Sequence, residues 1–178
     1  SINAWQVVPI FKLSIRILPC FRYAYYTTKK RIVNPKQKVT PTKNKRIKLF
    51  IGISKGRSEY KGTDIMLEAA ENIVNKYPEL VELQKAEGIP FEEYEKMMNG
   101  SDAILDQLYS YTPSMNPLLA MSKGIICIGG GEPENYEILN EKDLRPIINV
   151  LPTYESVYNE LEQLVLHPEI IPTLKRQS

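Results

Sequence analysis

Residues 110–137 read SYTPSMNPLLAMSKGIICIGGGEPENYE, and this stretch decides the fold class because a polar loop, a short helix, a strand and a glycine-rich turn follow one another in it. Asn116 suits an N-cap, Pro117 the first helical position and Gly124 a left-handed helix end. The run Ile-Ile-Cys-Ile at 125–128 is too short and too β-branched for a helix. It predicts a strand that is buried on both faces, as in a parallel sheet.

Strands and helices alternate along the rest of the chain from residue 47 onward. The hydrophobic pattern predicts strands at 47–54, 80–85, 103–106, 125–128 and 147–150. Amphipathic stripes and capping residues predict helices at 64–76, 91–98, 117–122, 135–139 and 154–166. This alternation indicates an α/β fold, a Rossmann-like parallel sheet with helices on both faces.

The composition indicates one domain with an appendage, which we divide into a basic, partly apolar N-terminal segment or interdomain connection at 1–46 and a Rossmann-like domain at 47–178. Two cysteines, Cys20 and Cys127, are too few for a disulfide framework and favour a reducing, cytoplasmic location. No apolar run reaches the roughly 18 residues of a membrane-spanning helix.

Charge is distributed very unevenly. Residues 1–58 contain fourteen Lys and Arg and no Asp or Glu, whereas 59–178 contain nine against twenty-one. Such segregation suggests that the first segment faces an anionic partner, for example the headgroups at the inner face of a membrane, although a solvated linker would have the same composition. We expect no nucleic-acid partner, because aromatic residues do not alternate with the lysines of 29–48.

Three polar loops follow predicted strands and should meet at one crevice, since ligands of parallel sheets bind outside the carboxyl ends of the strands. In the first loop, SKGRSEYKG at 54–62, Arg57 offers a planar fork for phosphate oxygens and Lys61 a mobile charge, so together they suit a diphosphate. The helix that follows the second loop adds the positive end of its dipole and the free amides of 114–118. The spacings of a P-loop and of a dinucleotide fingerprint are absent.

The order of several segments resembles the donor domain of GT-B glycosyltransferases of the group 1 type. The resemblance covers about 47–172, and it lies in TDIMLEAAENIVNKYP at 63–78, YEKMMNGSDAILD at 94–106, PLLAMSKGIICIGGG at 117–131, ENYEIL at 134–139 and VLPTYESVYNELEQLVLHPE at 150–169. It implies the C-terminal half of a GT-B fold, with the acceptor site on a separate N-terminal domain.

The resemblance also implies a function. The chain would bind a nucleoside diphosphate sugar as substrate, with no other cofactor and no metal, for transfer to a saccharide or lipid-linked acceptor. Arg57 and Lys61 would be the catalytic residues that stabilise the leaving diphosphate. A nucleotide-sugar epimerase of the GT-B type and a non-catalytic polyanion-binding α/β module remain alternatives.

The sequence departs from that family at two positions. The family's two glutamates fall on Tyr111 and Leu119, so other side chains must contact the sugar and the ribose. Lys55 would replace Arg57 if the register of the loop shifts. The candidate substrate-binding residues are therefore Lys55, Gln107, Tyr111, Ser114, Met115, Asn116, Glu134 and Glu137.

Overall fold

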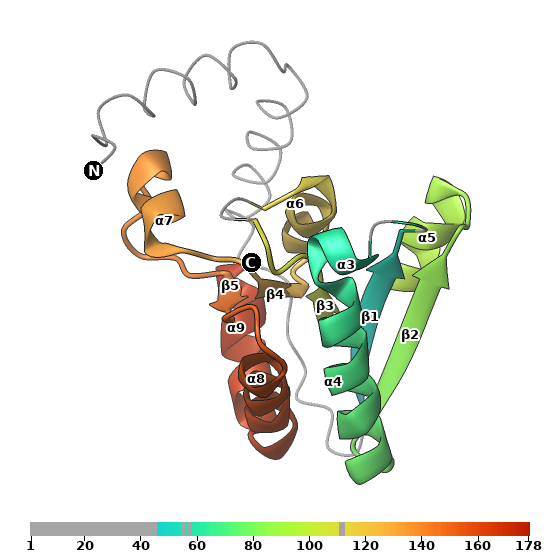
Figure 1. Cartoon of the computed structure of the whole chain (residues 1–178). Helices are drawn as coiled ribbons and strands as arrows, with labels where there is room; N and C mark the ends of the chain where they lie inside the picture. The colour runs from blue at the N-terminus through green and yellow to red at the C-terminus, as the bar shows by residue number, and fades with distance from the viewer. Residues whose placement is uncertain (1–45, 55, 57, 111–112) are drawn as a thin grey trace.

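The fold is a parallel sheet between layers of helices, seen in a computed structural model that describes residues 46–54, 56, 58–110 and 113–178 (Figure 1). The strands are β1 (Ile47–Ile53), β2 (Val81–Glu87), β3 (Ala103–Leu105), β4 (Ile126–Gly129) and β5 (Ile147–Asn149). The α-helices are α3 (Ser58–Lys61), α4 (Thr63–Lys76), α5 (Phe91–Met98), α6 (Met115–Ser122), α7 (Pro133–Leu139), α8 (Tyr154–Leu166) and α9 (Ile171–Gln177).

All strand pairs are parallel, in the order β2-β1-β3-β4-β5. This confirms the predicted α/β class. A short 3-10 turn, Pro168–Ile170, joins α8 to α9. Neither α9 nor the four-residue α3 is among the predicted elements.

Each face of the sheet packs against its own helices. Because side chains alternate along a strand, Leu49 and Ile51 of β1 join the core formed with α4 and α8, whereas Phe50 joins a second core with α5 and α6. The same alternation places Leu105 in the first core and Ile104 in the second. The prediction of helices on both faces is therefore confirmed.

One predicted boundary is wrong in a way that matters for the site. Ser114, rather than Asn116, is the N-cap of α6, and the helix begins at Met115, two residues before the predicted start. Pro117 thus occupies the third helical position. Its missing N–H costs nothing there, because the first N–H groups of a helix have no intrahelical acceptor.

Residues 1–45, most of the predicted N-terminal segment, lie outside the described residues. Within the part of the chain that the structure describes, no helix combines the length and apolar character needed to cross a membrane.

Candidate functional site

A cavity lies at the point in the sheet where the order of successive strands reverses, between β1 and β3. From β2 the chain crosses over β1 to form β3, so the connections that follow the adjacent strands β1 and β3 leave in opposite directions. Such a switch point opens a crevice at the carboxyl ends of the strands. The cavity there has a volume of about 300 Å³. It is lined by residues of β1, β2, α3, α4, α5 and α6 and of the loops that follow β1, β2 and β3. This volume is at the lower end of the range for small-molecule sites.

Lys61 lines this cavity and is held by the backbone of the loop after β3. The N–H of Leu108 donates to the carbonyl oxygen of Lys61 at 2.8 Å. Gly62 follows with φ of 70°, and a Cβ at this position would lie 2.9 Å from Cβ of Leu108. Only glycine combines this backbone conformation with so close an approach. The junction of α3 and α4 therefore places Lys61 beside the carboxyl end of β3.

Asp106 also lines the cavity, and it is absent from the sequence-based candidates. It directly follows β3, and alternation after Ile104 turns its side chain to the side of α5 and α6. Oγ of Ser114 donates to Oδ2 of Asp106 at 3.1 Å. Burial raises the pKa of Asp106, while the charge of Lys61 and the hydrogen bond from Ser114 oppose this shift. An aspartate directly after a buried strand was the sequence signal that could have found it.

Tyr94 of α5 forms another wall of the cavity. Its ring meets that of Phe50 edge-on, with 5.0 Å between centroids. A Cβ on Gly52 would lie 2.6 Å from Oη of Tyr94, so the missing side chain of Gly52 makes room for the phenol. Burial, with a smaller effect of the Asp106 charge, raises the pKa of Tyr94 to about 12. Tyr94 therefore remains a neutral hydrogen-bonding group at physiological pH.

The start of α6 faces the cavity through Asn116. Leu118 donates its N–H to the carbonyl oxygen of Ser114, and Pro117 has no N–H. The expectation of free amides along 114–118 was therefore too broad. The helical amides left without an intrahelical acceptor are those of Met115 and Asn116, where the helix dipole is positive.

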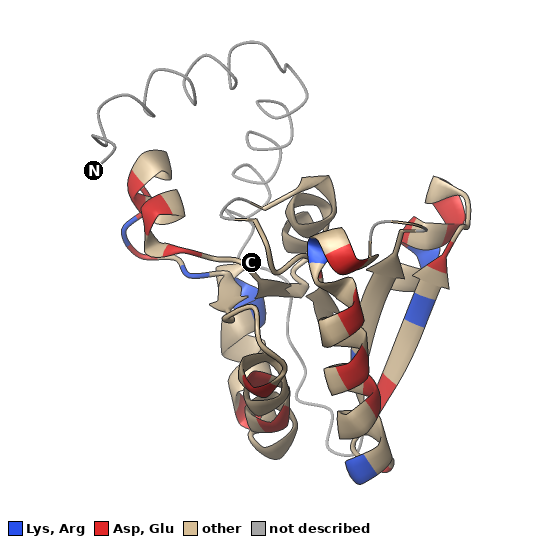
Figure 2. Cartoon of the chain, viewed as in Figure 1, with Lys and Arg blue, Asp and Glu red and all other residues tan. Residues whose placement is uncertain are grey.

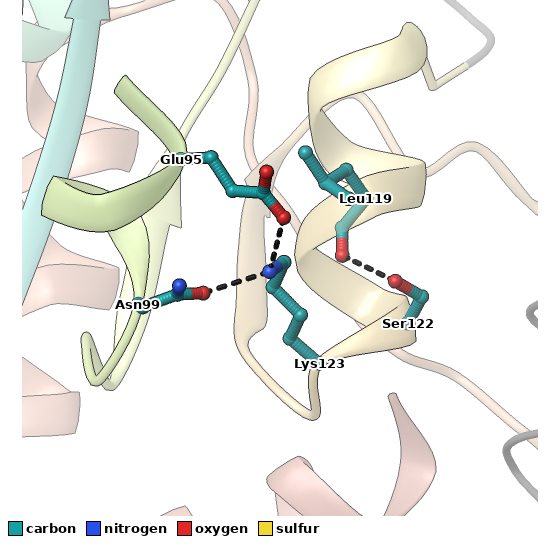
Figure 3. A network of polar contacts seen from close by, with 5 residues as sticks. All are labelled: Glu95, Asn99, Leu119, Ser122 and Lys123. Atoms are coloured by element: carbon teal, nitrogen blue, oxygen red, sulfur yellow. Dashed lines mark hydrogen bonds and ion pairs between the residues drawn. The ribbon is translucent and has the colours of Figure 1, made fainter. Parts of the chain in front are cut away.

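A polar network ties together the two helices that carry Tyr94 and Asn116 (Figure 3). Nζ of Lys123, the C-cap of α6, donates to Oε1 of Glu95 at 2.7 Å and to Oδ1 of Asn99 at 2.8 Å. Glu95 lies on α5, directly after Tyr94. The network therefore links α5 to the C-terminal end of α6.

Other predicted site residues that the structure describes do not line this cavity. Gln107 lines a separate hollow of about 10 Å³ between the ends of β3 and β4. Met115 is 47% exposed, and Glu134 and Glu137 are exposed on α7; none of the three lines the cavity. Lys55, Arg57 and Tyr111 lie outside the described residues. The substrate contacts expected of all seven residues stay predictions.

Charge around the cavity is mixed. Figure 2 shows acidic residues along α4 and α8 and a basic residue on α3. Among the described residues that line the cavity, Lys61 is the one Lys or Arg, and Asp106 is the one Asp or Glu. No group of three or more His, Cys, Asp or Glu in the described ranges is arranged to hold a metal ion. The cavity thus offers one cation, one carboxyl group and several neutral polar groups.

Comparison with known proteins gives one named likeness. No protein-family model matches the chain, and no curated protein matches it. Among solved structures, the chain is similar to the apo form of the lipopolysaccharide outer core galactosyltransferase WaaB, with 17% sequence identity and a TM-score of 0.46. The similarity covers 77% of this chain and 46% of that one, so the present chain spans less than half the length of that protein.

Proposed function

We propose that this chain is the donor-binding domain of a GT-B glycosyltransferase, and that its cavity binds a nucleoside diphosphate sugar. The observation that carries the proposal is the cavity at the switch point between β1 and β3, with Lys61 and the start of α6 on its walls. An ammonium group and a helix N-terminus are the groups that proteins use to bind phosphate. The order of motifs that resembles the GT-B donor domain supports the same ligand.

In this proposal Lys61 neutralises the diphosphate as the bond to the sugar breaks. The amides of Met115 and Asn116 hold phosphate oxygens, so negative charge that develops on the leaving group meets fixed positive charge. Arg57 would add a second cation from the loop after β1. The acceptor, a saccharide or a lipid-linked saccharide, would be bound by a further domain, and the product would be a longer glycan or polysaccharide.

A calorimetric titration with UDP, GDP, ADP and their glucose or mannose derivatives tests the proposal. We expect the wild-type chain to bind the diphosphates of one base selectively. Lys61→Ala should weaken this binding by roughly tenfold or more, because a hydrogen-bonded charge pair is lost from a partly buried site. Lys142→Ala is the matched control. Lys142 is exposed in the segment after α7, so this substitution removes the same charge at a position away from the cavity.

Equal binding by the wild type and Lys61→Ala would contradict the role of Lys61. Failure of the folded wild type to bind any of these diphosphates would contradict the proposed donor site itself. Circular dichroism of each variant should show that the helix content is unchanged, so that lost binding is not lost folding.

A further inference from the structure

The carboxyl group of Asp106 lies in a cavity that we assign to an anionic ligand. A carboxylate repels a diphosphate, yet the fold places this one beside Lys61 and the start of α6. Removing it from water is unfavourable unless hydrogen bonds compensate. The position of Asp106 therefore points to a part of the ligand that carries hydrogen-bond donors.

Asp106 is held in place but keeps hydrogen-bonding capacity. Ser114 occupies one site on Oδ2 with its 3.1 Å hydrogen bond, and a backbone hydrogen bond from Gln107 also supports the carboxyl group. An ionised carboxylate accepts about four hydrogen bonds, so further sites remain for a ligand. The strand register pairs Ile51 with Leu105, and the next pair in the same register sets Gly52 beside Asp106. Gly52 has no side chain that could cover Asp106, and the space beside it is taken by the phenol of Tyr94, which leaves the other sides of the carboxyl group for a ligand.

The surrounding side chains supply the cation and the donors that bind phosphate, whereas their oxygen atoms accept hydrogen bonds only as neutral groups, which is weaker than acceptance by a carboxylate. Lys61, Asn116, Ser54, Thr63 and Tyr94 all carry hydrogen-bond donors that line the cavity. Adjacent hydroxyl groups of a ribose or a hexose donate well to a carboxylate. Among the described lining residues, Asp106 is the one that offers such an acceptor.

We propose that Asp106 accepts hydrogen bonds from the hydroxyl groups of the ligand, those of the ribose or those of the transferred sugar, a role that rests on the proposed donor site. Asp106 is thereby a specificity-determining residue, and the cavity recognises a polyol attached to a diphosphate. It takes over a contact that the sequence does not provide at Tyr111 and Leu119.

The test compares Asp106→Asn with Glu68→Gln, which removes an exposed carboxylate from the outer face of α4. Each chain is titrated with inorganic pyrophosphate, UDP, 2′,3′-dideoxy-UDP and UDP-glucose, or with the counterparts of whichever base the wild type prefers. We expect Asp106→Asn to weaken UDP-glucose binding by roughly tenfold or more, since a hydrogen bond to a charged group is lost. Pyrophosphate binding should stay unchanged or become tighter, and Glu68→Gln should match the wild type.

The ligands distinguish the two sources of the hydroxyl groups. If they belong to the ribose, the loss appears with UDP as well as UDP-glucose and is absent with 2′,3′-dideoxy-UDP. If they belong to the transferred sugar, the loss is confined to UDP-glucose. Either pattern supports the assignment.

If Asp106→Asn binds UDP-glucose as tightly as the wild type does, the inference is overturned, while the proposed donor site still stands. An equal loss for pyrophosphate would also overturn it, because Asp106 would then act by positioning Lys61. If the wild type binds no nucleoside diphosphate, both this inference and the proposed function fail. Asp106→Ser, which keeps a smaller polar group, replaces Asp106→Asn if urea unfolding shows that the asparagine variant is not folded.

Discussion

At Asp106, a carboxylate that is proposed to favour ligand binding is expected to lower the stability of the fold. The carboxyl group of Asp106 is partly buried at the end of β3, and removal from water is the main reason that its pKa lies above the ordinary value. The folded state therefore binds this proton more tightly than the unfolded chain does. Stability contributed by the protonated form is present in acid and decreases as the pH rises through the raised pKa.

We accordingly expect Asp106→Asn to increase the free energy of unfolding at pH 7. The gain should decrease as the pH falls and be nearly absent at about pH 3, where the aspartate is largely protonated in both the folded and the unfolded state. Urea unfolding of the wild type and the variant between pH 3 and pH 8 measures the difference, with Glu68→Gln as the exposed control. A variant less stable than the wild type at pH 7 would show that the bonds to Asp106 outweigh its desolvation.

Gly62 is the other residue whose role can be tested alone. Gly62→Ala introduces both a strained positive φ and a clash with Leu108, whereas Gly100→Ala introduces the strain alone, since Gly100 has φ of 85° and open space around its Cβ position. We expect Gly100→Ala to cost about 1 kcal/mol and Gly62→Ala about 2 kcal/mol or more. Equal losses in urea unfolding would mean that the loop after β3 shifts to relieve the clash.

At the scale of the elements, the packing of α5 against α6 involves the side chain of Lys123. The side chain of Lys123 is 19% exposed, and it carries an ion pair with Glu95 as well as the bond to Asn99. The two helices are otherwise joined to the sheet by the core around Phe50 and Met121. Their orientation, and with it that of Tyr94 and Asn116, should therefore respond to the loss of one side chain.

We expect Lys123→Met to reduce the free energy of unfolding by about 1–2 kcal/mol, because a partly buried carboxylate loses its partner. Lys85→Met is the matched control: its ion pair with Glu71 joins two side chains that are each nearly half exposed. That variant should change stability by less than about 0.5 kcal/mol. Equal effects of the two substitutions would show that the α5–α6 network contributes no more than a surface pair.

The elements themselves follow from local patterns, and the sequence predicts them well. Apolar stripes place α4 and α8, and the β-branched run at 125–128 places β4 to within one residue. The start of α6 was misplaced because Ser114, Asn116 and Pro117 are all good residues for a helix N-terminus. The choice among them depends on the hydrogen bond from Ser114 to Asp106, which is a tertiary contact.

At the scale of the whole molecule, the cationic charge of the N-terminal region suggests contact with an anionic surface. The excess of fourteen cationic residues in 1–58 contrasts with the acidic remainder of the chain. We expect the chain to sediment with vesicles that contain phosphatidylglycerol and to be released by about 0.5 M salt, which shortens the range of surface electrostatics. Equal sedimentation with purely zwitterionic vesicles, or none with anionic ones, would exclude an electrostatic membrane contact.

The amino-acid sequence by itself determined the class of the fold and the identity of its elements, because the alternation of apolar runs and amphipathic stripes is a local property of the chain. It also singled out Lys61 and Asn116. Only the tertiary structure decided that Asp106 and Tyr94 join them. Asp106 follows β3 and Tyr94 lies on α5, and the two meet because β3 pairs with β1 across the switch point. Strand order is set by packing between residues far apart in the sequence, so local sequence patterns do not determine which loops lie next to one another.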